Sequence, residues 1–121
     1  MDNAAYLKVN AETREKERSI CGFRQRLLKK EDGVPTSVTR LRTNDAQAHW
    51  HKHTHEYYYV LSGEGSIRID GEEVPVKEGD CVWIRPGHMH QAIGEFEALI
   101  MGSPPFDYDD VIMEPPPGTG L

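Results

Sequence analysis

Short stretches in which apolar and polar residues alternate follow one another along most of the chain. Because successive side chains of a strand point to opposite faces, this period of two predicts β-strands. The predicted strands cover residues 36–43, 57–62, 66–70, 74–76, 81–85, 90–93 and 96–101. Many short strands at regular spacing, separated by turn residues, indicate a single all-β domain, a barrel or a sandwich, without internal repeats.

Glycine, proline and acidic residues mark the turns between these strands. Asp70-Gly71 is a favoured two-residue hairpin turn, and we interpret Gly63-Glu64-Gly65 as a second hairpin. Gly63-Glu64-Gly65 is not a nucleotide-binding loop, because a strand and not a helix follows it. Pro75 predicts that its strand lies at an edge or ends there, since proline cannot donate to a sheet hydrogen bond.

The stretch Cys81–Arg85 carries large apolar side chains on both of its predicted faces. That pattern is typical of a strand that is buried on both sides. We therefore expect Trp83 to lie in the core and Cys81 to be a buried, structural cysteine in a wall of the barrel.

The two ends of the chain lack the strand pattern. We expect residues 1–35 to form an N-terminal arm that packs on the barrel or on a partner subunit. Within this arm, residues 19–28 have both strand and helix character, and Gly22 weakens either prediction. Residues 104–121 are rich in proline, which cannot enter a sheet ladder, so they should form a tail over the surface. The barrel should then occupy residues 36–103.

Composition narrows the classes of function. The 121-residue chain has 14 Lys and Arg against 20 Asp and Glu, which gives a net charge of −6. This balance argues against nucleic acid or an anionic membrane surface as the main partner. No apolar run approaches the roughly 20 residues of a membrane span, and the first residues lack the order of a signal peptide. With two cysteines and no disulfide pattern, we expect a soluble, cytoplasmic protein.

Histidines gather in the stretch His49-Trp50-His51-Lys52-His53-Thr54-His55-Glu56, which holds four of the chain's 6. In a strand, His49 and His51 would present two imidazoles on one face. Glu56, beyond a short turn, starts the next strand and can add an oxygen ligand. Imidazoles that converge with a carboxylate are a typical set of metal ligands.

The spacing of these residues resembles that of the cupin superfamily. The first cupin motif is matched by His49, His51, Glu56 and Gly63. The second is matched by Gly79, Arg85-Pro86-Gly87 and His90. Two residues depart from the family pattern without removing a ligand: Arg85 stands where Pro is usual, and Gly94 stands where Asn is common. The resemblance covers about residues 36–103.

This resemblance implies a double-stranded β-helix, the jelly-roll barrel of small single-domain cupins of type 2. Such proteins are often homodimers. It also implies one divalent metal ion inside the barrel, held by His49, His51, Glu56 and His90. Neutral imidazoles with one carboxylate suit Fe, Mn, Ni, Zn or Cu. Four protein ligands would leave positions open on an octahedral metal, where a substrate oxygen or O₂ could bind.

Other side chains near the predicted ligands are candidates for chemistry. The period of two places Tyr58 and Val60 on the same face as Glu56, toward the cavity. We consider Tyr58, His53 and Gln91 as the catalytic candidates, which would move protons or orient the substrate. Tyr58 could equally be a packed core residue.

The remaining histidines have open interpretations. His53 and His55 could lie at the barrel mouth, where they would help to bind an anionic substrate or would be solvated. An alternative register would use His51 and His53 as ligands, although it leaves only two residues before Glu56. His88 has either a role in the site or a role in the turn alone.

Two classes of function agree with these observations. The first is a metal-dependent enzyme, a dioxygenase, decarboxylase or isomerase, that acts on a small organic acid, phenol or sugar derivative. The second is a non-catalytic module that binds a small ligand or a metal. In both, the partner is a small molecule, and neither nucleic acid nor a membrane takes part. A fold alone does not decide between them, because one architecture hosts many chemistries.

Overall fold

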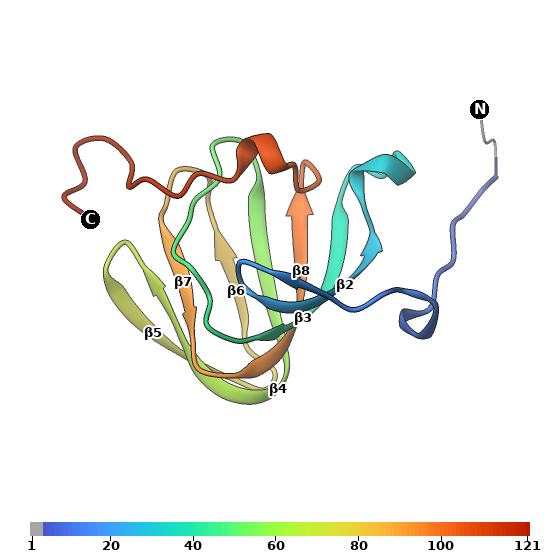
Figure 1. Ribbon diagram of the computed structural model, residues 1–121, viewed down its shortest axis with the longest axis horizontal. Helices are drawn as coiled ribbons and strands as arrows, with labels where there is room; N and C mark the ends of the chain where they lie inside the picture. The colour runs from blue at the N-terminus through green and yellow to red at the C-terminus, as the bar shows by residue number, and fades with distance from the viewer. Residues whose placement is uncertain (1–3) are drawn as a thin grey trace.

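A computed structural model describes residues 4–121, and within that range the chain is almost entirely β-structure (Figure 1). The strands of the described residues are β1 Glu17–Ser19, β2 Gly22–Leu28, β3 Ser37–Thr43, β4 His55–Ile69, β5 Glu72–Lys77, β6 Cys81–Ile84, β7 His90–Ile93 and β8 Phe96–Ser103. The short 3-10 helices are η1 Ala11–Thr13, η2 Lys30–Asp32 and η3 Tyr108–Asp110. Among the described residues, no helix has the length and apolar character needed to span a membrane.

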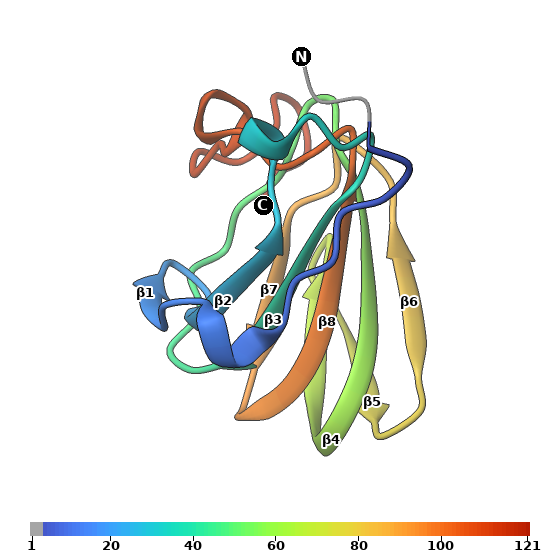
Figure 2. The same cartoon turned by 90° about the vertical axis from the view of Figure 1, so that its right-hand side faces the viewer.

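All of these strands join one antiparallel sheet that curls around a common interior (Figures 1 and 2). They follow the order β1-β2-β3-β8-β4-β5, and β6 and β7 both pair with β4. The first half of β4 pairs with β8 and β6, and its second half pairs with β5 and β7. The long strand β4 therefore connects two layers of the barrel. The expected all-β fold class is confirmed.

A continuous strand replaces the hairpin that we expected at Gly63-Glu64-Gly65. β4 runs unbroken through these residues, and its register against β8 shifts just before them, between Val60 and Ser62. A Cβ atom at Gly65 would lie 2.4 Å from the carbonyl oxygen of Ile93, so only glycine allows the close approach of β7. The hairpin prediction was wrong because glycines mark bulges and bends of a strand as well as turns.

The register shift also changes which positions of β4 face the interior. Before it, Glu56, Tyr58 and Val60 are buried, and after it Ile67 is buried. One extra residue in a strand moves every later side chain to the opposite face. Because the strand changes layers at the same place, both of its halves still direct side chains into the barrel.

The hydrophobic core lies between the two layers. β8 alternates strictly along its length, with Phe96, Ala98 and Ile100 buried. The full set of buried apolar residues is Leu41, Ala46, Tyr58, Val60, Ile67, Val76, Ile84, Ala92, Phe96, Ala98 and Ile100. This continuous core encloses one end of the barrel, and polar side chains occupy the other end.

The hairpin at Asp70-Gly71 is confirmed. Ile69 and Glu72 pair across it, and both turn residues have positive φ, 50° and 85°. That conformation matches the right-handed twist of the strands that the turn joins. β5 ends the strand order, which agrees with the edge position that Pro75 predicted.

β6 differs from the prediction of a strand buried on both sides. Trp83 is 46% exposed, and Cys81 is exposed as well. The outer face of β6 is open to solvent within the described residues. Trp83 instead stacks against His55 and Tyr57 of the neighbouring strand, with ring centroids 5.8 and 6.3 Å away. Apolar residues on both faces therefore did not indicate burial on both faces here.

Two strands precede the expected start of the barrel at residue 36. β1 pairs with β2, and β2 pairs with β3 along most of its length, so this part of the N-terminal segment belongs to the sheet. The side-chain amide of Gln25 donates to the carbonyl oxygens of Ala11 and Arg14, at 2.7 and 3.1 Å, and so fastens the preceding residues to β2. The alternation of β2 was hard to recognise because polar residues occupy both of its faces.

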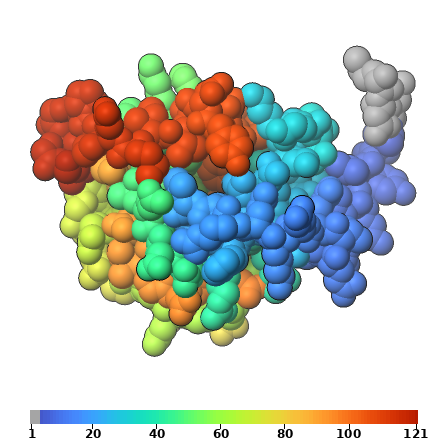
Figure 3. Space-filling model, in the orientation of Figure 1, coloured from blue at the N-terminus to red at the C-terminus, as the bar shows by residue number. Residues whose placement is uncertain are grey.

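The C-terminal residues cross one end of the barrel (Figure 3). They follow β8 through η3 and form a single bridge between Ile112 and Trp50. The indole nitrogen of Trp50 also donates to the carbonyl oxygen of Glu114, at 2.6 Å. Near the start of this segment, Asp107 forms an ion pair with Lys30 of η2. The segment is therefore attached to both sides of the polar end.

Candidate metal centre

Three imidazoles and one carboxylate meet inside the barrel, although they come from segments far apart in the chain. His49 forms a single bridge with His90, the first residue of β7, through backbone hydrogen bonds of 3.0 and 2.9 Å. His51 lies in the following loop, and Glu56 is the second residue of β4. All four side chains are buried. One possible ligand atom from each lies within 4.8 Å of the others.

The expected histidine strand is reduced to two single bridges. His49 pairs with His90 and Trp50 pairs with Ile112, whereas the residues after them form a loop. The rings of His49 and His51 nevertheless converge, with centroids 5.0 Å apart. Side chains two residues apart share a face in extended backbone, and a full ladder of hydrogen bonds is not needed for that.

A backbone carbonyl holds each imidazole by its Nδ1 atom. The acceptors are the carbonyl oxygens of Gln47 for His49 at 3.0 Å, of Asp110 for His51 at 2.8 Å, and of His88 for His90 at 3.0 Å. Because a carbonyl oxygen only accepts, each Nδ1 must carry the hydrogen and donate it. Each Nε2 then keeps a free lone pair, which is the arrangement of metal-binding histidines.

The free Nε2 atoms lie close to the carboxylate of Glu56. Its Oε1 atom is 2.6 Å from Nε2 of His90 and 3.4 Å from Nε2 of His51. Despite these distances, none of the three buried atoms has a hydrogen bond of acceptable geometry. Buried polar atoms without partners are costly, and one cation between them would satisfy all three. The donor set therefore fits a divalent metal ion that accepts nitrogen and oxygen ligands.

Burial and neighbouring charges set the protonation of the cluster. Burial lowers the pKa of His49 to about 4, which leaves its imidazole neutral. Burial by itself would raise the pKa of Glu56, but His90 and His51 beside it outweigh that effect and hold the pKa below its usual value. Burial also opposes the charged form of His90, yet the Glu56 carboxylate raises its pKa. The raised pKa of His90 favours a proton on its Nε2 atom, and a metal ion bound here would take the place of that proton.

Asp110 organises the loop that carries His51. Its carboxylate accepts hydrogen bonds from the backbone N–H groups of Lys52 at 2.7 Å, His53 at 3.0 Å and Thr54 at 3.1 Å. Its own carbonyl oxygen accepts from Nδ1 of His51. One residue of the C-terminal segment therefore fixes both the loop and the orientation of a candidate ligand.

Sequence reasoning did not identify Asp110. The residue lies in an acidic run within the segment that was interpreted as a surface tail. Nothing in that run distinguishes Asp110, which is 7% exposed, from Asp109, which is exposed. Only the return of the chain across the barrel end reveals the difference.

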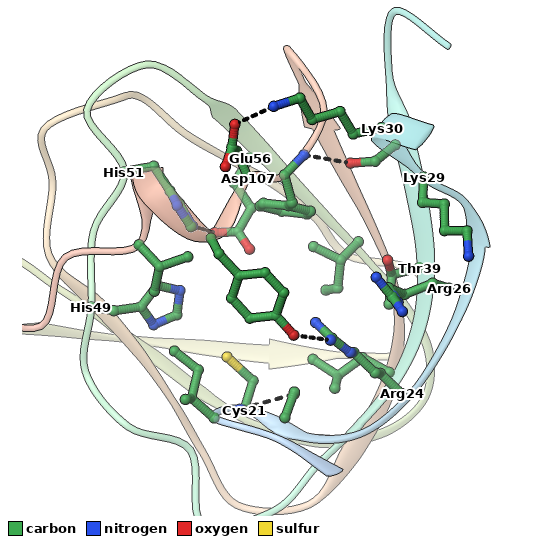
Figure 4. A pocket seen from close by; sticks show the side chains of 18 of the residues that line it. Cys21, Arg24, Arg26, Lys29, Lys30, Thr39, His49, His51, Glu56 and Asp107 are labelled. Carbon is green, nitrogen blue, oxygen red and sulfur yellow. Dashed lines mark hydrogen bonds and ion pairs between the residues drawn. The ribbon is translucent and has the colours of Figure 1, made fainter. Parts of the chain in front are cut away.

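The four side chains lie beside a cavity of about 210 Å³. His49, His51 and Glu56 line it, and Figure 4 shows their side chains directed into it. The lining continues along β2, β3, β4 and β8 and along the C-terminal segment. The other residues that line it are Ser19, Ile20, Cys21, Arg24, Arg26, Leu28, Lys29, Lys30, Glu31, Ser37, Thr39, Leu41, Tyr58, Ile100, Phe106, Asp107, Tyr108 and Val111.

Two side chains of this lining carry protons that burial holds in place. Tyr58 is 1% exposed, and burial raises the pKa of its hydroxyl well above the usual value. Burial likewise raises the pKa of the Cys21 thiol to about 12. Both groups are therefore neutral, and each can donate a hydrogen bond into the cavity but is a poor nucleophile.

The structure separates the three expected catalytic residues. Tyr58 lines the cavity, as the period of two predicted. The side chain of His53 is exposed, and it is not part of the cavity lining or of the ligand cluster. Gln91 follows His90 on β7 and points away from it, with its amide donating to the carbonyl oxygen of Ala46 at 2.8 Å. The cluster includes His49, which agrees with the first of the two ligand registers.

His55 and His88 also lie outside the cluster. His55 accepts a hydrogen bond from the indole nitrogen of Trp83, at 3.1 Å, on the outer face of the sheet. His88 pairs with Asp70 of the neighbouring turn. Both residues therefore have partners on the protein surface, away from the cavity lining.

Two curated proteins are similar to parts of the chain. Over 66 residues it is 36% identical to an uncharacterized protein of Methanocaldococcus jannaschii, which covers 50% of this chain and 53% of that protein. Over 42 residues it is 43% identical to the oxalate-binding protein of Thermotoga maritima, covering 33% and 35% of the two chains. The chain thus spans about half or less of the length of these curated relatives.

Solved structures match nearly the whole fold. A crystal structure of a protein from Planctomyces limnophilus has a TM-score of 0.82 and 27% identity, and covers 90% of this chain and 97% of that one. Pac13 of Streptomyces, a nucleoside dehydratase, has a TM-score of 0.81 at 19% identity and covers 95% and 96%. The second likeness concerns the fold alone. The family model of the cupin domain matches residues 41–101, so the chain belongs to the cupin family.

Proposed function

We propose that this cupin is a metal-dependent enzyme that acts on a small organic acid, phenol or sugar derivative. His49, His51, Glu56 and His90 would hold one divalent metal ion, with Fe, Mn, Ni, Zn and Cu as the candidates. When bound, such an ion would supply Lewis-acid chemistry for decarboxylation or isomerisation, and a redox-active ion such as Fe would also supply the O₂ activation that dioxygenation needs.

The observation that carries this proposal is the position of the ligand cluster in the wall of the cavity. His49, His51 and Glu56 all line that cavity, so a ligand inside it can reach the metal-binding atoms. A structural metal site is closed on all sides by protein ligands, whereas a catalytic one keeps a side open to substrate. The geometry therefore supports chemistry at the site better than a purely structural role.

The cavity residues would hold and orient the substrate. Tyr58 lies two residues after Glu56 on the same face of β4, and its neutral hydroxyl can donate a hydrogen bond or a proton. The Cys21 thiol is a second, weaker donor in the same lining.

The experiment is a screen of metal-loaded protein. The purified protein is loaded with each candidate metal in turn, its metal content is measured by elemental analysis, and products are sought by mass spectrometry. The substrates are panels of small organic acids, phenols and sugar derivatives, with Glu56→Gln as the matched control. We expect one equivalent of metal and a product that the control variant does not form.

A non-catalytic binding module is the second candidate. The similarity to a protein named oxalate-binding protein favours it, because that name describes binding and not turnover. In this case the metal-loaded protein would bind a small acid tightly and release it unchanged. Tight binding without product, across every metal and substrate of the screen, would replace the enzyme proposal with this one.

A further inference from the structure

Two arginines of β2 point into the cavity. The inward positions of barrel strands usually carry apolar side chains. Arg24 and Arg26 line the cavity together with Leu28. Figure 4 shows these arginines at one side of the cavity and His49 and His51 at the other. Charged groups that are partly removed from water need partners, and in a chain of net charge −6 an inward pair of cations indicates a specific role.

The protein satisfies only part of the hydrogen-bonding capacity of this arginine pair. The Nε atoms of Arg24 and Arg26 both donate to one carboxylate oxygen of Glu17, at 3.1 and 2.7 Å. Nη2 of Arg24 donates to the hydroxyl of Tyr108 at 3.0 Å. A guanidinium has five N–H donors, so most donors of the pair remain for another acceptor. One carboxylate also leaves one of the two positive charges uncompensated.

The other charges of the lining do not cancel this excess. Lys30 is paired with Asp107, and Lys29 and Glu31, which both line the cavity, carry opposite charges that offset each other. The cavity therefore has a cationic wall on the β2 side, and the candidate metal ligands lie in the opposite wall.

We propose that the ligand of this cavity is a small organic dianion with an oxyanion group at each end. One group would lie at the metal ligands His49, His51 and Glu56, and the other would be bound by Arg24 and Arg26. This inference rests on the proposed function and specifies its substrate class. A guanidinium fork matches a carboxylate or a phosphorus oxyanion in two parallel hydrogen bonds, which a neutral sugar or phenol cannot accept in the same way.

The size of the cavity restricts the ligand further. Its volume of about 210 Å³ is below the roughly 300–1,000 Å³ of pockets for drug-sized ligands. A dicarboxylate with a short carbon skeleton is of suitable size. His53 and His55, which the sequence suggested as anion-binding residues at the mouth, are not part of this lining.

Calorimetric binding without turnover tests the proposal on metal-loaded protein of measured metal content. The probes are malonate, succinate and glutarate, each compared with its monomethyl ester, and phosphonoacetate. We expect at least one dicarboxylate to bind about tenfold or more tightly than its ester, as for a charged hydrogen bond. Arg26→Gln should abolish that preference at unchanged metal content. Arg40→Gln is the control, because Arg40 pairs with Glu97 on the outer face. This variant should keep the preference for the dicarboxylate.

A second variant guards against loss of folding. Glu17→Gln removes the carboxylate that competes for both guanidinium groups, so the preference for the dianion should increase. Misfolding cannot produce an increase. Tighter binding of phosphonoacetate than of malonate, if Arg26→Gln removes the difference, would assign a phosphorus oxyanion to the arginine end, and tighter binding of malonate would assign a carboxylate.

The outcomes separate this inference from the proposed function. A protein that takes up metal but binds every dicarboxylate and ester equally overturns the dianion assignment alone. A preference that persists in both Arg26→Gln and Arg24→Gln overturns it as well. Failure to bind any candidate metal, with an arginine-dependent preference still present, instead refutes the proposed function and supports an anion-binding cavity.

Discussion

The two faces of the first half of β4 carry similar side chains and use them differently. On the inner face, Glu56 and Tyr58 are 3% and 1% exposed and belong to the candidate site. On the outer face, Tyr59 is 41% exposed. His55, also on that face, stacks on Trp83 and accepts a hydrogen bond from its indole. Residue type alone therefore does not distinguish a candidate ligand from a surface residue.

What separates the two faces is how each imidazole is held. Inside the barrel, backbone carbonyls fix the Nδ1 hydrogens of His51 and His90 and direct the Nε2 lone pairs toward Glu56. On the outer face, the Nδ1 atom of His55 accepts a hydrogen bond instead, so its ring is held by Trp83 and not by the backbone. A carbonyl that fixes the tautomer, together with burial, makes an imidazole a ready metal ligand.

The largest expected effect is on metal content. His51→Ala should lower metal affinity by about 100-fold or more. Loss of a ligand should cost at least as much affinity as loss of a group that hydrogen-bonds to the ligand and orients it. His55→Ala, the matched variant on the outer face, should keep full stoichiometry. Elemental analysis after dialysis measures both, and circular dichroism checks that the β-structure is retained. Equal metal content in the two variants would contradict the ligand assignment.

The next effect is on stability. Tyr58→Ala should lower the free energy of unfolding by about 3–5 kcal/mol, since it removes a buried aromatic ring from the core. Tyr59→Ala, at the exposed neighbouring position, should change it by about 0.5 kcal/mol or less. Chemical denaturation of both variants gives the two values. A similar loss in each would show that the faces of β4 are less different than their exposure suggests.

Asp110 sharpens the comparison because it acts on the inner site from outside the strands. Asp110→Ala should lower metal affinity by about 10–100-fold, the usual effect of losing a group that orients a ligand. The loop of His51 would lose three backbone hydrogen bonds to the carboxylate. Asp109→Ala, at an exposed neighbour, is the control. Competition with a chelator measures both affinities, and an unchanged value for Asp110→Ala would disprove its positioning role.

The same residue predicts a pH dependence of stability. Burial would raise the pKa of Asp110, but the N–H groups of His53, Lys52 and Thr54 hold it below the ordinary 3.8. A carboxyl group whose pKa is lower in the folded than in the unfolded state stabilises the folded protein at pH values above its unfolded-state pKa. This contribution is lost as the pH falls through the folded-state pKa. In metal-free protein, the stability difference between wild type and Asp110→Ala should be constant above about pH 5 and shrink below about pH 4. A stability difference that grows on acidification would show that folding raises, rather than lowers, the pKa of Asp110.

The smallest effect is expected on the outer face. Trp83→Ala removes stacking with two rings and a contact with the guanidinium of Arg85, 3.9 Å from the ring centroid. Such exposed contacts contribute about 0.5–1 kcal/mol each, so the free energy of unfolding should fall by about 1–2 kcal/mol. Metal content should not change. Loss of metal in this variant would show that the outer face supports the site.

Local pattern predicted much of the architecture and of the candidate site. Alternation along β3 and β8 indicated strands with one buried face, and Asp70-Gly71 indicated a hairpin. The spacing from His49 to Glu56 indicated that their side chains would converge. These features follow from interactions between residues close in the sequence, where backbone geometry alone decides which side chains share a face.

Long-range packing decided the features that the pattern missed. The glycines around Glu64 signalled a reversal, but the approach of β7 selected a bent, continuous strand. Apolar residues in β6 signalled burial, but no other layer covers the outer face of Trp83 among the described residues. In each case a local signal allowed two structures, and contacts with distant strands selected one of them.

The sequence by itself determined the fold class, the family motifs and the residue types of the candidate metal-ligand cluster, because each depends on short spacings along the chain. Only the tertiary structure showed that Asp110 orients His51 and that Arg24 and Arg26 face the same cavity as the cluster. The physical reason is distance along the chain. Hydrogen bonds and charge between segments many residues apart depend on how the barrel closes, and no local spacing records that closure.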